Sequence, residues 1–220
     1  MVSKTGWNML YKCKMANKEI LAFGDHRQLT PVDMGGGLVD NKNFFKLMFH
    51  KVTENTDNYR NNFTQEYYDF LRLNAFTHRK REILKHNTPY KEAQVIVAYY
   101  NKTRKIYNEK MCKHHNISNI TDKDAKVICK TNIFRDKGIY NNFCFTVEET
   151  DGEDVNLISE AGVRYTVDKE KFIKTFDYAY ARTLYSVQGQ TLKSFHYALE
   201  DLNVVHGREL YTLISRLKNK

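Results

Sequence analysis

Apolar and polar positions follow one another in different ways along the chain, and the changes predict where strands and helices lie. The run Ile20–Phe23 predicts a short buried strand, and Gly24 marks the turn that ends it. The run Val95–Ala98 is apolar at every position, as expected of a parallel strand that is buried on both faces. A segment rich in lysine and tyrosine, 102–115, follows and predicts a helix. This order of strand and helix is typical of an α/β domain.

Between 126 and 176 the apolar runs become short, and turn signals separate them. The runs read KVICK, FCFTVEE, VNLIS and RYTVD. The turns are predicted at Gly138, Asn141–Asn142, Asp151–Gly152 and Ala161–Gly162. Turn residues at this spacing favour hairpins. The segment therefore predicts a small antiparallel β module inserted into the α/β domain.

The end of the chain returns to the α/β pattern. We expect a strand near 178–181, a helix after it, a second strand near 196–199 and a last helix from about Gly207. The whole chain is then an α/β protein in four parts, which are 1–50, 51–122, 123–176 and 177–220.

The charge of the chain indicates an anionic partner. Lysine and arginine number 35 against 26 aspartate and glutamate, which gives a net charge of +9. Nucleic acid is the usual partner of such a chain, because cationic side chains that neutralise phosphates release counterions. The alternative is a solvated basic surface without a specific partner.

The four cysteines and the lack of long apolar runs bear on the compartment. The cysteines form no CxxC pair, and their spacing indicates neither a disulfide framework nor a metal site; they are Cys13, Cys112, Cys129 and Cys144. No apolar stretch approaches the roughly 20 residues of a membrane span, and no signal-peptide pattern follows Met1. We therefore expect no metal, no membrane partner and an intracellular, reducing location, with viral, cytoplasmic and nuclear locations all left open.

Five short motifs together resemble a known family. They are GDHRQLTPV (24–32), NYRNN (58–62), YNKTR (100–104), YSVQGQT (185–191) and LISR (213–216). In this order and at these distances they resemble the later motifs of superfamily 1 DNA helicases of the RecD and PIF type. Each motif alone is weak, but five in order are specific. The resemblance implies the second RecA-like domain of a P-loop NTPase with an SH3-like insertion, preceded by a remnant of the first RecA-like domain.

The resemblance also implies a nucleotide site. Phosphoryl transfer is catalysed by positioning and charge stabilisation, for which arginines from a second domain are suited. By resemblance Arg60 and Arg216 are the two arginine fingers, and Gln28 is the amide that senses the γ-phosphate. Gly24, Asp25 and Gly189 are expected to complete the nucleotide-binding set. From the residues alone, Arg60 is equally compatible with a cap or an ion pair on a helix surface.

A second set of residues is expected to contact single-stranded DNA. Strand-to-helix junctions offer backbone N–H groups and a helix N-terminus, both of which favour phosphate. The two predicted junctions carry Asn101, Lys102, Thr103, Ser186, Gln188, Gln190 and Thr191. By resemblance, both line the path of the DNA.

Two motifs of the complete family do not occur in these 220 residues. There is no GxxxxGK[ST] phosphate loop, and no DE pair precedes GDHRQLTPV. We therefore expect ATP and Mg²⁺ to bind only when the missing N-terminal half is present, fused or as a separate polypeptide. Met1 could be the methionine of the DE-x-SM string that relatives carry.

Three interpretations stay open from the sequence. In the first, the chain is the C-terminal half of an ATP-dependent DNA helicase with 5′ to 3′ movement, which does not hydrolyse ATP alone. In the second, it is a single-strand-binding module without enzymatic activity. In the third, it is the product of a decayed reading frame. A neighbouring reading frame that encodes the phosphate loop would favour the first.

Overall fold

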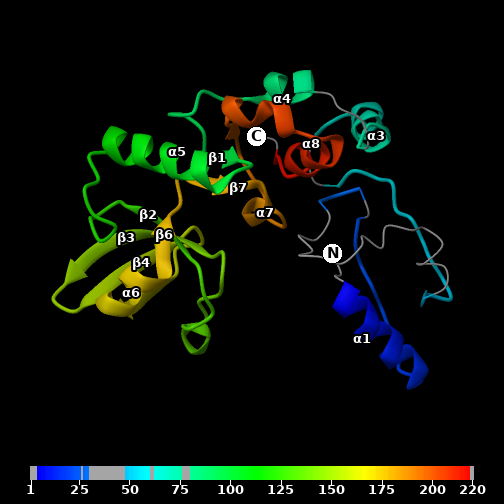
Figure 1. Cartoon of the computed structure of the whole chain (residues 1–220), viewed down its shortest axis with the longest axis horizontal. Coiled ribbons are helices and arrows are strands. Elements are labelled where there is room, and N and C mark those ends of the chain that lie inside the picture. The colour runs from blue at the N-terminus through cyan, green and yellow to red at the C-terminus, as the bar shows by residue number, and fades with distance from the viewer. Residues whose placement is uncertain (1–3, 26, 30–47, 60–61, 76–79, 219–220) are drawn as a thin grey trace. The chain divides into compact units, whose positions relative to one another are not determined.

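In the computed structural model, the chain forms two compact units. Figure 1 shows the helices and strands of the whole chain. The structure describes residues 4–25, 27–29, 48–59, 62–75 and 80–218. Unit 1 consists of the described residues of 1–79 together with His206–Ser215, and unit 2 consists of Lys80–Val205 with Arg216–Lys218. The four-part division of the sequence stays a prediction.

The regular structure in the described part of unit 1 is helical. The helices described there are α1 (Lys4–Met15), α3 (Gln65–Leu73) and α8 (Gly207–Ile214). Helix α3 begins after Thr64, whose hydroxyl accepts a hydrogen bond from the Tyr67 N–H at 3.2 Å and so caps the helix.

The predicted strand at Ile20–Phe23 is wrong. Residues 18–25 form no regular structure, and Leu21 and Phe23 are 78% and 96% exposed. A four-residue apolar run forms a strand only where neighbouring strands pair with it and bury its side chains, and the described part of unit 1 contains no strand. The loop that begins at Gly24 therefore does not follow a strand end.

Unit 2 contains a parallel sheet of three strands, in the order β7, β1, β8. The strands are β1 (Val95–Ala98), β7 (Ala181–Thr183) and β8 (Phe195–Tyr197). All four residues of β1 are buried, as the apolar pattern predicts for a central parallel strand. Helix α5 (Asn101–His114) packs against β1 and β7, and Figure 1 shows it running alongside them. The prediction of a parallel α/β domain is confirmed.

A separate antiparallel sheet of five strands forms the inserted module, in the order β5, β4, β3, β2, β6. The strands are β2 (Lys126–Cys129), β3 (Cys144–Asp151), β4 (Asp154–Ser159), β5 (Arg164–Asp168) and β6 (Phe176–Tyr178). The short helix η1 (Arg135–Lys137) follows β2, and α6 (Lys169–Thr175) follows β5. The four predicted strand runs are thus confirmed.

The predicted turns of the module adopt left-handed backbone conformations. Gly138, Gly152 and Gly162 have φ angles of 78°, 55° and 79°, and Asn142 has 69°. Glycine and asparagine tolerate this region, which explains why these residues separate the strands.

The predicted strand at 178–181 is divided between the two sheets. Tyr178 ends β6 in the antiparallel sheet, and Ala181 begins β7 in the parallel sheet. Asn108 of α5 spans the gap: its side chain donates to the carbonyls of Tyr178 and Ala181 at 3.2 and 3.1 Å and accepts the Ala181 N–H at 2.7 Å. These bonds satisfy backbone groups that neither sheet reaches, and so the chain can change sheets there.

The remaining elements of unit 2 are short. They are α4 (Lys80–His86), α7 (Leu184–Val187) and η2 (Leu199–Val204). Strand β8 and the start of α8 confirm the strand and helix expected at the end of the chain.

We expect Ile139→Ala to lower the free energy of unfolding by about 2–4 kcal/mol, because the Ile139 side chain is fully buried in the core of the module. Ile173→Ala is the matched control, since Ile173 lies on α6 with 54% of its surface exposed, and it should change stability by less than about 0.5 kcal/mol. Urea denaturation of both variants measures the difference. Equal effects would contradict the assigned core.

Candidate functional site

The carboxyl ends of three parallel strands meet at one edge of the small sheet. Ala98 at the end of β1 is the Cα partner of Thr183 at the end of β7, and Val97 is the partner of Tyr197 in β8. The segments that leave these strands are 99–103, 184–191 and 198–204. In open α/β sheets, ligands bind at this edge. Parallel pairing thus brings together both predicted DNA-contact segments, although more than 80 residues separate them in the sequence.

Asp201 fixes the start of α5 at this edge. Its carboxylate is buried and accepts hydrogen bonds from the N–H groups of Tyr99 and Tyr100 at 2.7 and 3.2 Å. It also accepts the Thr103 hydroxyl at 2.8 Å. A carboxylate near the N-terminus of a helix is favourable because the helix dipole is positive there.

The other predicted residues of this helix start are exposed. Lys102 is exposed, and Asn101 is exposed while its side-chain oxygen accepts a bond from Arg104 Nε at 3.2 Å. The N–H groups of a first helical turn have no acceptor within the helix. Those of Asn101 and Lys102 are therefore suited to bind an anion.

The second segment, 184–191, is a short helix followed by a turn. Thr183 caps α7 by accepting the Ser186 N–H at 3.4 Å, and the Ser186 hydroxyl donates to the Thr183 carbonyl at 2.8 Å. Gly189 has a φ of 87°, a conformation that favours glycine, so the turn after Gln188 depends on it. Gln188 is half-buried and Thr191 is exposed.

Arg182 of β7 is a buried cation, 5% exposed, that contacts this turn. Its guanidinium donates to the side-chain oxygen of Gln190 at 2.6 Å and to the carbonyl of Ser186. Burial lowers the pKa of Arg182 below its usual value.

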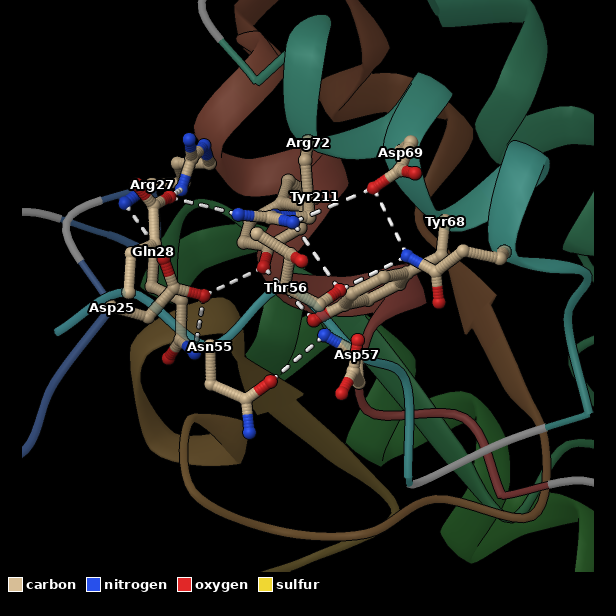
Figure 2. Close-up of polar contacts among 12 residues, drawn as sticks. Asp25, Arg27, Gln28, Asn55, Thr56, Asp57, Tyr68, Asp69, Arg72 and Tyr211 are labelled. Atoms are coloured by element: carbon tan, nitrogen blue, oxygen red, sulfur yellow. Dashed lines mark hydrogen bonds and ion pairs between the residues drawn. The ribbon is translucent and has the colours of Figure 1, made fainter.

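In unit 1, the carboxylate of Asp25 is the centre of a polar network (Figure 2). It accepts the Tyr211 hydroxyl of α8 at 2.6 Å, the Gln28 side-chain amide at 3.2 Å and the Arg27 N–H at 3.0 Å. Burial and the bond to Asp25 raise the pKa of Tyr211 well above its usual value, so its hydroxyl keeps its proton at neutral pH. Gly24, before Asp25, is exposed.

A second contact holds the same loop to α8. The Leu29 N–H donates to the Thr212 hydroxyl at 3.0 Å, and both residues are fully buried. Glu54 accepts hydrogen bonds from Arg27 of this loop and from Arg72 of α3, at 2.8 Å each. The loop 25–29 is therefore fixed to α8 by side chains of two consecutive residues, Tyr211 and Thr212.

Comparison with known proteins finds solved structures with a similar fold. No family model and no curated protein sequence matches the chain. A Bacteroides Pif1 helicase bound to single-stranded DNA is 12% identical, with a TM-score of 0.53 over 71% of this chain and 49% of that one. The fold is Pif1-like. At this identity the similarity concerns the fold alone.

Two further solved structures are similar in part. A Candida albicans Pif1 helicase is 15% identical, with a TM-score of 0.47 over 71% of this chain and 53% of that one. A structure of two coordinating Pif1 helicases at forked DNA is 13% identical, with a TM-score of 0.49 over 69% of this chain and 45% of that one. The chain spans about half the length of these helicases.

Within the Pif1-like fold, the predicted nucleotide residues are divided between the units. Gly24, Asp25 and Gln28 belong to unit 1, whereas Gly189 and Arg216 belong to unit 2. Arg216 is buried, and its carbonyl accepts the Leu192 N–H at 2.9 Å. Arg60 lies outside the described residues. The nucleotide role of each stays a prediction.

Three residues that shape these sites were missed by the sequence argument. Asp201 follows a predicted parallel strand, and a carboxylate at such a strand end is a signal that could have found it. Arg182 is a single cation directly after the predicted strand 178–181, which is a similar signal. Tyr211 gave none, because its role depends on Asp25, 186 residues away in the sequence.

Within the described ranges, no group of three or more His, Cys, Asp and Glu side chains is placed to hold a metal ion. Of the helices the structure describes, none has the length and apolar character needed to span a membrane.

We expect Asp201→Ala to lower the free energy of unfolding by about 2–4 kcal/mol, because three donors lose their acceptor. The exposed Asp136 on η1 provides the control, Asp136→Ala, with an effect below about 0.5 kcal/mol. Thermal and urea denaturation measure both. An unchanged stability of Asp201→Ala would mean that the carboxylate does not hold the start of α5.

Proposed function

We propose that the chain is the C-terminal half of an ATP-dependent DNA helicase, with 5′ to 3′ movement, and that it binds single-stranded DNA. In this proposal Arg60 and Arg216 supply positive charge to a nucleotide site whose phosphate loop lies on a further segment. Gln28 senses the γ-phosphate.

One observation carries the proposal. The register Ala98↔Thr183 brings the YNKTR and YSVQGQT segments to the same sheet edge. These are the two segments that the motifs assign to the DNA path. The Pif1-like fold supports this reading, because the Bacteroides Pif1 helicase of the same fold is bound to single-stranded DNA.

The chemistry of the edge suits a strand without sequence preference. Lys102 and the N–H groups of the first turn of α5 favour phosphate. The amides of Gln188 and Gln190 can contact sugars, phosphates or base edges. Asp201 is the one buried carboxylate described at this edge, and its oxygens already accept three hydrogen bonds from α5 and the residues before it. These bonds compensate the negative charge of Asp201, which reduces its repulsion of a phosphate.

In this proposal, Gln28 also relays the state of the nucleotide to the DNA-binding side, and its contacts in unit 1 define where such a relay starts. The side-chain amide of Gln28 donates to Asp25, which is held by Tyr211. Helix α8, which carries Tyr211, ends two residues before Arg216. A movement of the Gln28 loop is therefore linked by hydrogen bonds to the helix that precedes an expected arginine finger.

We expect the chain to bind single-stranded DNA weakly, with little sequence preference and with affinity that falls as salt rises. If about three phosphates are neutralised, the slope of log K against log salt is near −2, from roughly 0.7 per phosphate. Fluorescence anisotropy with labelled oligonucleotides of different sequence measures it. Lys102→Ala and Gln188→Ala should weaken binding to all sequences alike.

The control for lost charge is Lys113→Ala, at the other end of the same helix. At 1.5 Å per residue, about 16 Å separate the two positions. Its affinity should stay within about twofold of the parent chain, since a distant exposed charge is screened. A flat salt response, or tight binding to one sequence only, would contradict the proposed DNA edge.

We expect the 220-residue chain to hydrolyse no ATP, with or without DNA, because it contains no phosphate loop to hold the β- and γ-phosphates. When a segment with GxxxxGK[ST] and the DE pair is fused ahead of Met1, DNA-stimulated ATPase activity should appear. Mixing the segment in trans should work less well, because docking loses the effective concentration of a covalent link. Phosphate release measures each case.

In the fused protein, Arg216→Ala and Arg60→Ala should each reduce turnover by about 10³-fold or more, as expected of arginine fingers. Gln28→Ala should retain ATP turnover but uncouple it from strand separation. DNA affinity of the arginine variants should equal that of the fused parent, which controls for misfolding. Parent-like turnover in Arg216→Ala, alongside intact DNA binding, would favour the single-strand-binding module instead.

A further inference from the structure

Arg182 forms hydrogen bonds with the predicted DNA-contact turn, Ser186–Gln190. It is buried, and two of its nitrogens donate to the turn, one to the side chain of Gln190 at 2.6 Å and one to the Ser186 carbonyl. These contacts bridge the turn from its helical start to its end. A buried charge is costly unless it is bonded, so the turn and the guanidinium stabilise each other.

The contact also fixes which end of the Gln190 amide is free. A guanidinium has only donors, so Gln190 must present its carbonyl oxygen to Arg182. The amide NH₂ group is then left as a pair of donors that Arg182 cannot use. Phosphate oxygens accept hydrogen bonds, and this orientation is the one that can bind them.

Two residues of the module affect the charge of Arg182. Cys144 at the start of β3 and the Glu160 carboxylate both raise the pKa of Arg182 and so oppose the effect of burial, which lowers it. The charged guanidinium that the turn needs is therefore favoured by the neighbouring module. The fixed guanidinium can orient Gln190 without moving itself.

We propose that Arg182 is a positioning residue that holds the Ser186–Gln190 turn in place and orients Gln190 as a hydrogen-bond donor to single-stranded nucleic acid. The part concerning nucleic acid rests on the proposed function. The part concerning the turn stands on the contacts of Arg182 and is tested without DNA.

The test without DNA is amide hydrogen exchange of the intact chain. The N–H groups of Gln188 and Gln190 donate within the turn, to the Tyr185 and Val187 carbonyls at 3.3 and 3.1 Å. Arg182→Met should speed the exchange of both N–H groups about tenfold, because the turn loses at least one hydrogen bond to a charged group. Exchange at Ala198, bonded to Val97 in the sheet, should not change. Unchanged exchange at both turn amides would overturn the proposal.

The test with DNA is a double-mutant cycle. Arg182→Met and Gln190→Met should each weaken binding to a labelled oligonucleotide about tenfold. The double variant should bind the oligonucleotide no more weakly than the weaker-binding single variant does, because both substitutions remove the same oriented amide. The charge control is Arg164→Met, which removes an exposed cation paired with Glu148 on the module, and it should change affinity less than twofold. Additive losses of about 100-fold would overturn the proposal.

Two further variants keep the outcomes distinct. Gln190→Glu retains an acceptor for Arg182 but has no N–H donors, so the turn should exchange like the parent while DNA binding falls about tenfold. Arg182→Lys keeps the positive charge but cannot donate to Gln190 and Ser186 in the geometry of the guanidinium. This variant takes the place of Arg182→Met in the exchange experiment if Arg182→Met does not fold. If the parent itself binds no DNA, the proposed function fails, and exchange in the Arg182 variant still decides whether Arg182 holds the turn.

Discussion

The parallel pairing of β1 with β7 and β8 is the constraint on which unit 2 depends. Parallel strands place their carboxyl ends at one edge, so the segments that leave them meet there whatever their separation in the sequence. The pairs Ala98↔Thr183 and Val97↔Tyr197 set this edge to within one residue. A slip of register by one position would exchange the two faces of β1, both of which are buried, and so change what each side chain packs against. The packing of β1 therefore fixes the geometry of the edge as well as the core.

Two buried charges of opposite sign lie at this edge and organise the segments that cross it. Asp201 holds the start of α5, and Arg182 holds the turn after α7. Each is bonded to backbone and side-chain groups of a neighbouring segment, so neither charge is left without compensation. The edge is thereby fixed by the protein itself, and the exposed groups on it, Lys102 among them, need little rearrangement to meet a ligand. Such preorganisation reduces the entropic cost of binding.

Most of the fold of unit 2 could be predicted because its signals are local. The buried run Val95–Ala98 and the hairpin turns of the module each depend on residues within a short window. The strand predicted at Ile20–Phe23 failed because a strand needs partners that a local pattern cannot show. The segment 178–181 was split because Asn108, far away in the sequence, lets the chain change sheets. The two segments predicted to contact DNA were located through motifs, but Arg182 and Asp201 act through contacts that only the fold reveals.

The module enters and leaves the parallel domain through neighbouring strands. Val127 in β2 is the Cα partner of Tyr178 in β6, and the Ala179 N–H bonds to the Lys126 carbonyl at 2.9 Å. The stem of the insertion is thus closed by its own backbone, and chain lengthened or shortened beyond that stem adds little loop entropy. Because of this stem, the module beyond it can be replaced without changing the positions of the two chain segments that lead into it. Evolution, or a protein engineer, can exchange or resize the domain beyond it while the parallel strands keep their register.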